Sequence, residues 1–277
     1  MTDMIFRLGG KTYKVDSNWG DDAKQYINNV SAVSSDRDGF IYVLQRSSPF
    51  MLIFNTYGKL MDQWHNKEIT DAHYLEISPD GEVFIVERDH HRIVVFNKQG
   101  EMLRMIGDKY NPGNIGEPFN HPSDISFTND GDFFVSDGYG NTHVHHFDKS
   151  EEHINTWGQP GTEAGSFITP HAVLVDQKER VLVTDRENNR VQIFDRSGKY
   201  LKDLPNVFHP MDICQDKDGF IYVTDQVPSL HMFNPDDECV GRCRTFGTFG
   251  HGVTVDEHGD IYIAEMLPDG LTKMTGV

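Results

Sequence analysis

The sequence of 277 residues has few cysteines, an excess of acidic over basic residues, and no long apolar run. Three cysteines exclude a disulfide framework, and Cys239 and Cys243, with three residues between them, lack the second half of a zinc knuckle. A net charge of -18 argues against nucleic acid, whose phosphates require a basic surface. No stretch approaches the roughly 20 apolar residues of a membrane-spanning helix, and the start has no signal-peptide run. We therefore expect a cytoplasmic protein with neither nucleic acid nor membrane as its partner.

A sequence pattern recurs at intervals of 40 to 50 residues: two strands with alternating apolar and polar residues, joined by a tight turn. A third strand follows each copy, and an outer fourth strand follows every copy but the last, as in 92–96 and 101–106. This period is typical of propeller blades, and helical spacing is missing. The turns of the copies are Asp38-Gly39, Asp80-Gly81, Asp130-Gly131, Lys178-Glu179, Asp218-Gly219 and His258-Gly259. Six copies predict an all-β, six-bladed β-propeller with four-stranded antiparallel blades, forming one domain over residues 1–277.

The last copy ends after its third strand, 271–274. Either 5–8 or 12–15, which precede the first copy, is free to supply the missing outer strand. We predict that an N-terminal strand completes the last blade, since closure protects sheet edges.

The residue eight places before each turn, which we name the channel position, is histidine in alternate copies. In a six-bladed ring these copies stand about 120° apart, and the first strand of each blade lines the channel. In chain order the channel positions are Ser31, His73, Ser123, His171, Met211 and His251. Three imidazoles with an open fourth position are typical of catalytic zinc. Iron, copper or cobalt fit the same ligands, and the alternative to a metal site is that scattered histidines share a register by coincidence.

The corners after each second strand lie at the same end as these histidines. Arg46, Arg88 and Arg186 follow there and could hold an anionic substrate, because guanidinium matches carboxylate in a bidentate geometry. The alternative for each arginine is a local carboxylate partner. The acidic residue that leads most corners is expected to accept backbone N–H groups from the neighbouring blade.

Tyr139 breaks the corner pattern, at a place where its phenol could reach a metal-bound group and act as a base. A packed surface aromatic is the alternative interpretation. His121 and His209 are interpreted as turn residues or as groups behind the metal ligands. We expect His143, His145 and His146 to face solvent.

The sequence of the copies resembles the NHL repeat class of six-bladed propellers, as in 157–170 and 185–194. Residues 170–173 and 136–144 further resemble the histidine and tyrosine motifs of peptidyl-α-hydroxyglycine α-amidating lyases. Residues 184–192 resemble an arginine motif of the same family, and Arg46 corresponds to its second arginine by position alone. The resemblance implies zinc on His73, His171 and His251, with Tyr139 and arginine acting on a carbinolamide to release glyoxylate and an amide.

Two departures from that family concern Gly140 and Gly252. A cysteine of the family stands where this chain has Gly140, so the family's disulfide bridge is not expected. Gly252 stands where an acidic ligand of structural calcium would be, which makes calcium doubtful. We therefore expect a zinc-dependent lyase for a small anionic or amide-containing substrate. The alternatives are a hydrolase or hydratase on the same site, or a non-catalytic propeller that binds a protein or small ligand.

Overall fold

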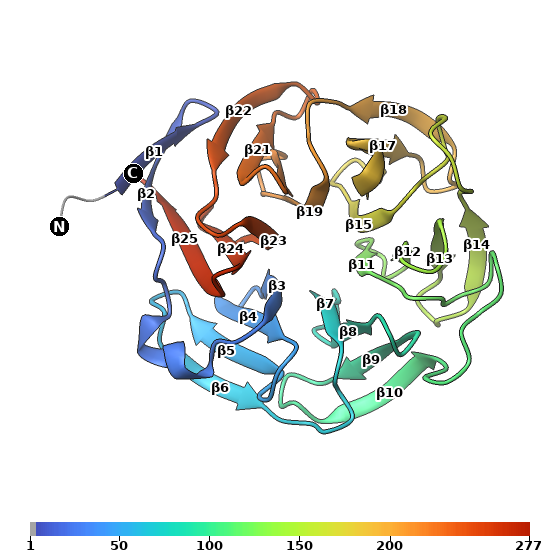
Figure 1. The fold of residues 1–277 in the computed structure, drawn as a ribbon, viewed down its shortest axis with the longest axis horizontal. Coiled ribbons are helices and arrows are strands. Elements are labelled where there is room, and N and C mark those ends of the chain that lie inside the picture. The colour runs from blue at the N-terminus through green and yellow to red at the C-terminus, as the bar shows by residue number, and fades with distance from the viewer. Residues whose placement is uncertain (1–3) are drawn as a thin grey trace. The chain divides into compact units, whose positions relative to one another are not determined.

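The computed structural model describes residues 4–277, and the chain divides into two compact units. One unit is Met1–Thr70 with Met211–Val277, and the other is Asp71–Pro210. Described residues form six sheets, each a four-stranded antiparallel meander, and one of them carries a fifth strand (Figure 1). The fold class is thus the predicted all-β, six-bladed propeller. That residues 1–277 form a single domain stays a prediction.

The unit Asp71–Pro210 holds three consecutive blades, here called blades 2, 3 and 4. Each runs from an inner first strand to an outer fourth strand, in chain order. Blade 2 is β7 (Ala72–Ile77), β8 (Val83–Glu87), β9 (Arg92–Phe96) and β10 (Met102–Gly107). Blade 3 is β11 (Asp124–Phe127), β12 (Phe133–Asp137), β13 (His143–Phe147) and β14 (His153–Trp157). Blade 4 is β15 (Pro170–Val175), β16 (Val181–Asp185), β17 (Arg190–Phe194) and β18 (Tyr200–Leu204).

The other unit holds blades 1, 5 and 6. Blade 1 is β3 (Val30–Ser35), β4 (Phe40–Gln45), β5 (Met51–Asn55) and β6 (Leu60–Trp64). Blade 5 is β19 (Pro210–Gln215), β20 (Ile221–Asp225), β21 (Ser229–Phe233) and β22 (Cys239–Arg244). Blade 6 is β23 (Phe249–Val255), β24 (Ile261–Met266) and β25 (Gly270–Gly276). Short 3-10 helices occur at η1 (Asp21–Tyr26) and η2 (Arg186–Asn188).

An N-terminal strand completes blade 6, as the sequence predicted. Of the two candidate segments, β2 (Lys11–Asp16) pairs with β25, with Val15 opposite Met274. The other segment, β1 (Met4–Leu8), pairs with β2 and adds the fifth strand. Both segments therefore belong to the sheet of blade 6: β1 is its outermost strand, and β2 lies between β1 and β25.

An aspartate caps the tight turn in four of the blades, as in blade 4. The carboxylate of Asp176 accepts the backbone N–H groups of Lys178 and Arg180, each at 2.9 Å. Glu179 takes a φ of 59° at the place where the other five turns have a glycine in the left-handed region. The alignment of Lys178-Glu179 with the Asp-Gly turns is therefore confirmed.

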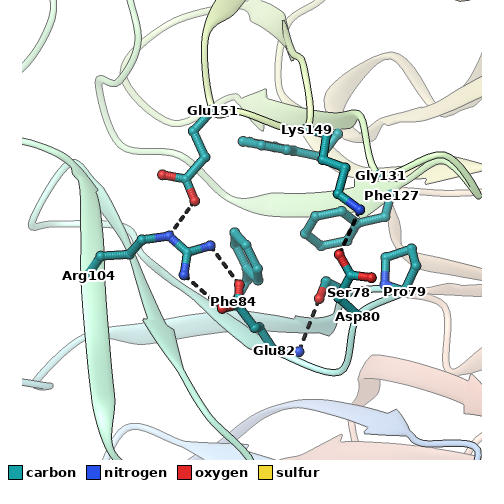
Figure 2. A pocket seen from close by; sticks show the side chains of 11 residues that line it. Ser78, Pro79, Asp80, Glu82, Phe84, Arg104, Phe127, Gly131, Lys149 and Glu151 are labelled. Carbon is teal, nitrogen blue, oxygen red and sulfur yellow. Dashed lines mark hydrogen bonds and ion pairs between the residues drawn. The ribbon is translucent and has the colours of Figure 1, made fainter.

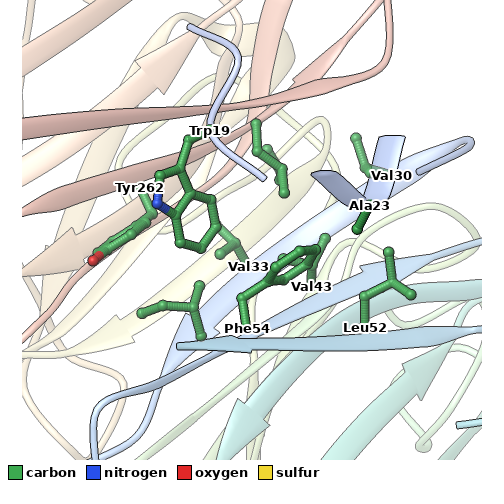
Figure 3. Packing of buried hydrophobic residues seen from close by; sticks show 11 residues of the cluster. Trp19, Ala23, Val30, Val33, Val43, Leu52, Phe54 and Tyr262 are labelled. Atoms are coloured by element: carbon green, nitrogen blue, oxygen red, sulfur yellow. The ribbon is translucent and has the colours of Figure 1, made fainter. Parts of the chain in front are cut away.

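Apolar side chains fill the space between neighbouring blades. In the unit that contains blade 1, Trp19 packs against Phe54 at 5.3 Å and Tyr262 at 5.0 Å between ring centroids (Figure 3). Val33 and Val43, both buried, belong to the same cluster. Burial of each such side chain contributes roughly 1.5–3 kcal/mol. This packing fixes the first strands, and hence the residues at their starts.

Candidate metal centre

Each predicted histidine is the extra residue of a β-bulge. Ala72 and Tyr74 of β7 lie opposite two consecutive residues of β8. His73, which stands between them, is therefore the added residue of the bulge. His171 in β15 and His251 in β23 are added in the same way. All three side chains are buried. Because a bulge re-aims a side chain out of the regular alternation, the three histidines share one local geometry.

Two of these imidazoles have a defined tautomer. His73 Nδ1 lies 2.7 Å from the carbonyl oxygen of Ser123, and His251 Nδ1 lies 2.6 Å from that of Ser31. A carbonyl oxygen only accepts hydrogen bonds, so Nδ1 carries the proton in both rings. In the neutral form of each ring, Nε2 then keeps its lone pair, which is the state that a metal ligand needs.

Tyr139 brings its phenol oxygen to the histidines of blades 2 and 4. The oxygen lies 2.9 Å from Nε2 of His171 and 3.2 Å from Nε2 of His73. The ligand nitrogens of these two histidines lie within 4.8 Å of each other. The described part of Asp71–Pro210 thus gathers two imidazole nitrogens and one phenol oxygen at a single point.

The loop that carries Tyr139 is tightly held. The N–H groups of Tyr139 and Gly140 donate to the carbonyls of His121 and Asn120, at 3.3 and 3.1 Å. A Cβ at Gly138 would stand 2.0 Å from the carbonyl oxygen of Pro170, and one at Gly140 would stand 2.2 Å from Asn120 Oδ1. Only glycine fits this close approach. The two glycines therefore allow the tyrosine to reach the histidines.

Arg186 contacts the same phenol. It lies on η2, directly after β16, and its Nη1 donates to the Tyr139 hydroxyl at 3.1 Å. Its Nε is held by Glu187 at 2.9 Å. These two contacts leave donor capacity on the guanidinium group, which presents five N–H donors in a fixed fork. Arg186 therefore combines a fixed position with donors left for a ligand.

Arg88 also lies near the tyrosine, but local carboxylates hold it. Its guanidinium carbon is 5.1 Å from the centre of the Tyr139 ring. Its nitrogens pair with Asp89 at 2.9 Å and Asp71 at 3.2 Å. Burial lowers the pKa of Arg88, and the hydrogen bond to Asp89 and the charges of both carboxylates raise it by more, so that the group stays charged. Arg88 thus fits the alternative in which an arginine pairs with a local carboxylate instead of a substrate.

Arg46 lies in the other unit, directly after β4, where its N–H donates to the carbonyl of Asn29 at 3.0 Å. Its role in substrate binding stays a prediction. The roles of His73, His171, His251, Tyr139, Arg186 and Arg88 stay predictions in the same sense, although their placement is now known.

The acidic corner residues are structural, but their donors differ from the expectation. Asp137 accepts the N–H of Asn120 at 2.8 Å, and Asp185 accepts that of Ile168 at 3.0 Å. Each donor lies in the loop that enters the same blade, rather than in a neighbouring blade. The carboxylates also accept from third-strand side chains, such as His145 at 3.2 Å. They therefore hold the loops around the site.

The expectation that three histidines of β13 face solvent is wrong. His143, His145 and His146 are all buried, because a third strand is covered on both faces by neighbouring blades. Asp137 and Asp132 compensate the burial of His145 and His146. His121 and His209 are turn residues with φ of 62° and 47°.

A hollow of about 260 Å³ lies at the turn end of blades 2 and 3 (Figure 2). Arg104 there is paired with Glu82 at 2.6 Å and with Glu151, and Lys149 is paired with Asp80 at 2.9 Å. His73 lies near the start of β7, whereas this hollow lies at the other end of that strand. The charged groups of the hollow satisfy one another, so they offer no chemistry comparable to the histidine site.

Among residues 4–277, no helix has the length and apolar character needed to cross a membrane. The three cysteines are free thiols.

Comparison with known proteins agrees with the motifs. Residues 167–194 match the family model of the NHL repeat. The mouse protein "NHL repeat-containing protein 3" is 24% identical over 94% of this chain and 83% of its own length. The Drosophila melanogaster "Peptidyl-alpha-hydroxyglycine alpha-amidating lyase 1" is 30% identical over 54% of this chain and 30% of its own length. A solved virginiamycin B lyase from Staphylococcus aureus shares the fold, with a TM-score of 0.72 at 14% identity, and the match covers 96% of this chain and 100% of that chain.

These matches confirm the resemblance that the motifs indicated: the chain is similar along most of its length to an NHL-repeat protein, and along a shorter span to an amidating lyase.

Proposed function

We propose that the chain is a zinc-dependent lyase that cleaves the C–N bond of an α-hydroxyglycine-type substrate. The observation that carries the proposal is the position of the Tyr139 hydroxyl, within 3.2 Å of His73 Nε2, His171 Nε2 and Arg186 Nη1. Similarity to an amidating lyase supports it. A phenol that lies beside two imidazole nitrogens and a cation is well placed for acid–base catalysis.

His73 and His171 are the proposed ligands in blades 2 and 4, and His251 is the proposed third. The bulge, the burial and the Nδ1 hydrogen bond of His251 match those of His73, which supports this assignment. Neutral imidazoles suit zinc as well as other late divalent metals. A zinc ion held there would act as a Lewis acid on the substrate hydroxyl.

The protein's own groups then carry out the cleavage. Arg186, with Arg46 as a second candidate, holds the carboxylate of HO–CH(COO⁻)–NH–C(O)R. Tyr139, as its phenolate, takes the hydroxyl proton, the C–N electron pair leaves with nitrogen, and the Tyr139 phenol then returns that proton to the nitrogen. The products are glyoxylate and the primary amide R–C(O)–NH2, which balance the reaction.

The test is glyoxylate release from an N-acyl-α-hydroxyglycine by zinc-loaded protein. We expect activity in the wild type and a loss of about 10²- to 10⁴-fold in Tyr139→Phe, the usual range for a lost general base. Tyr110→Phe, which changes an exposed tyrosine in the β10–β11 loop, is the matched control and should keep full activity. No release by zinc-loaded wild type would contradict the lyase.

A second candidate is a non-catalytic propeller that binds a protein or small ligand. It is favoured by the long match to a relative named only for its repeats. A third candidate, hydrolysis or hydration, uses the same residues. Protein that is purified without metal, and whose ligand binding is the same in Tyr139→Phe as in the wild type, would support the binding module. Zinc-loaded protein that is active on another substrate would support hydrolysis or hydration.

A further inference from the structure

The bulge at His171 exposes backbone groups that side chains then satisfy. The N–H of Ala172 donates to Thr184 Oγ1 at 2.7 Å, from the neighbouring strand β16. The N–H of Val173 donates to Asp124 Oδ2 at 2.7 Å, from β11 of the neighbouring blade. These are the two amides directly after His171. Thr184 and Asp124 are fully buried, so these amides depend on side-chain acceptors rather than on bulk water.

The carboxylate of Asp124 suits this place better than an amide would. Its second oxygen, Oδ1, accepts the N–H of Ile125 at 2.6 Å, so both oxygens face backbone donors. An asparagine would turn its NH2 group against one of these donors. A buried carboxylate is costly unless it is fully hydrogen-bonded, which argues against Asp124 as a residue that only fills space.

The same arrangement recurs in the other unit. Asp212 Oδ2 accepts the N–H of Val253 at 2.6 Å, and Asp212 Oδ1 accepts that of Ile213 at 2.8 Å. Val253 lies two residues after His251, as Val173 lies two residues after His171. Asp124 and Asp212 each stand one place after a channel position that is not histidine. Two separate units therefore use one arrangement beside a bulged histidine.

Serine side chains of blade 3 extend this contact along β15. Ser123 Oγ donates to the carbonyl of Pro170 at 3.1 Å, and Ser126 Oγ accepts the N–H of Val175 at 3.0 Å. Side chains on or next to β11 thus hold the edge of β15 on both sides of the bulge.

We propose that Asp124 and Thr184 are positioning residues, which fix the bulge so that His171 directs Nε2 toward Tyr139, and that Asp212 fixes the bulge at His251 within the other unit. This inference rests on the proposed function for its catalytic meaning, but the geometry it claims exists in the metal-free protein. Loss of either acceptor leaves a buried N–H without a partner and lets the bulge shift along β15.

The test uses Thr184→Val, Thr184→Ser and Asp124→Asn. Thr184→Val keeps the shape and removes the acceptor, whereas Thr184→Ser keeps the acceptor. Asp176→Asn is the matched control, because Asp176 is a buried carboxylate that accepts backbone N–H groups at the far end of the same strand. Each variant is compared with the wild type for unfolding midpoint, for imidazole ¹H–¹⁵N signals at one pH, and for zinc affinity.

We expect the His171 Nε2 signal, identified by its absence in His171→Ala, to move in Thr184→Val and Asp124→Asn. Zinc affinity should fall by roughly 10- to 100-fold in both, the range seen when groups that support ligands are lost. Thr184→Ser and Asp176→Asn should keep the wild-type signal, even where Asp176→Asn lowers the midpoint. Unmoved His171 signals in both acceptor variants would overturn the inference. If the wild type binds no zinc but the His171 signal still moves in Thr184→Val and Asp124→Asn, the result would contradict the proposed function and support the positioning role.

Discussion

The proposed chemistry centres on the phenol of Tyr139 and the groups that surround it. Tyr139 is 36% exposed, so its ring is open to a ligand while its hydroxyl lies against buried imidazoles. Guanidinium groups of Arg88 and Arg186 lie 5.1 and 5.2 Å from the ring centre. Both cations lie near the electron-rich face of the ring, which attracts positive charge. In the proposed lyase, Arg186 rather than Arg88 holds the substrate, because local carboxylates already pair with Arg88.

We predict that Arg186→Lys lowers kcat/KM by roughly tenfold or more, about 1.4 kcal/mol, mainly through KM. Lysine keeps the charge but lacks the planar fork with which arginine reaches Tyr139 and Glu187 and still pairs with a substrate carboxylate in a bidentate geometry. Steady-state kinetics of glyoxylate release measure the effect. Arg180→Lys is the matched control, since Arg180 pairs with Asp176 at the turn end of the same blade at 2.6 Å. Equal kinetics for the two variants would remove Arg186 from substrate binding.

At the scale of strands, the bulges and the corner loops decide where side chains point. The spacing of each histidine from its turn was enough to predict that His73, His171 and His251 occupy equivalent positions, because the repeat is regular. The bulges themselves could not be predicted, since they depend on how each first strand pairs with the second. The buried state of His143, His145 and His146 was missed for a related reason: a polar strand resembles a surface strand until the covering blades are in place.

Those buried histidines predict a pH dependence of stability. Burial lowers the pKa of His143, with His145 adding to the effect, and burial lowers the pKa of His146 against the opposing pull of Asp132. The folded state therefore binds fewer protons than the unfolded state, whose ordinary value is 6.5. Stability is fully present above that pH and falls as the pH drops through it toward the folded pKa values.

Urea unfolding between about pH 7.5 and 5 measures this loss, with a slope of at most about 1.4 kcal/mol per pH unit for each histidine. His143→Gln should flatten the slope in this range. An unchanged slope in that variant would show that other groups control the pH dependence.

For the whole molecule, the repeat predicted the number of blades and the strand that completes blade 6. Two features of the sequence allowed this: the turns recur at a similar spacing, and a spare strand precedes the first copy. The sequence did not distinguish β1 from β2, because both alternate and only their pairing with β25 separates them. The relatives that match this chain include a protein named only for its repeats and a lyase. Their names alone therefore do not decide between a binding module and an enzyme.

The most direct measurement is the zinc content of purified protein after exchange against dilute zinc, for the wild type and for His73→Ala, His171→Ala and His251→Ala. His209→Ala, which changes a turn histidine, is the control. We predict about one zinc per chain in the wild type and in the control, as for a site with three protein ligands, and loss of it in each of the three variants. A wild type without zinc, or variants that all keep it, would contradict a metal centre on these histidines.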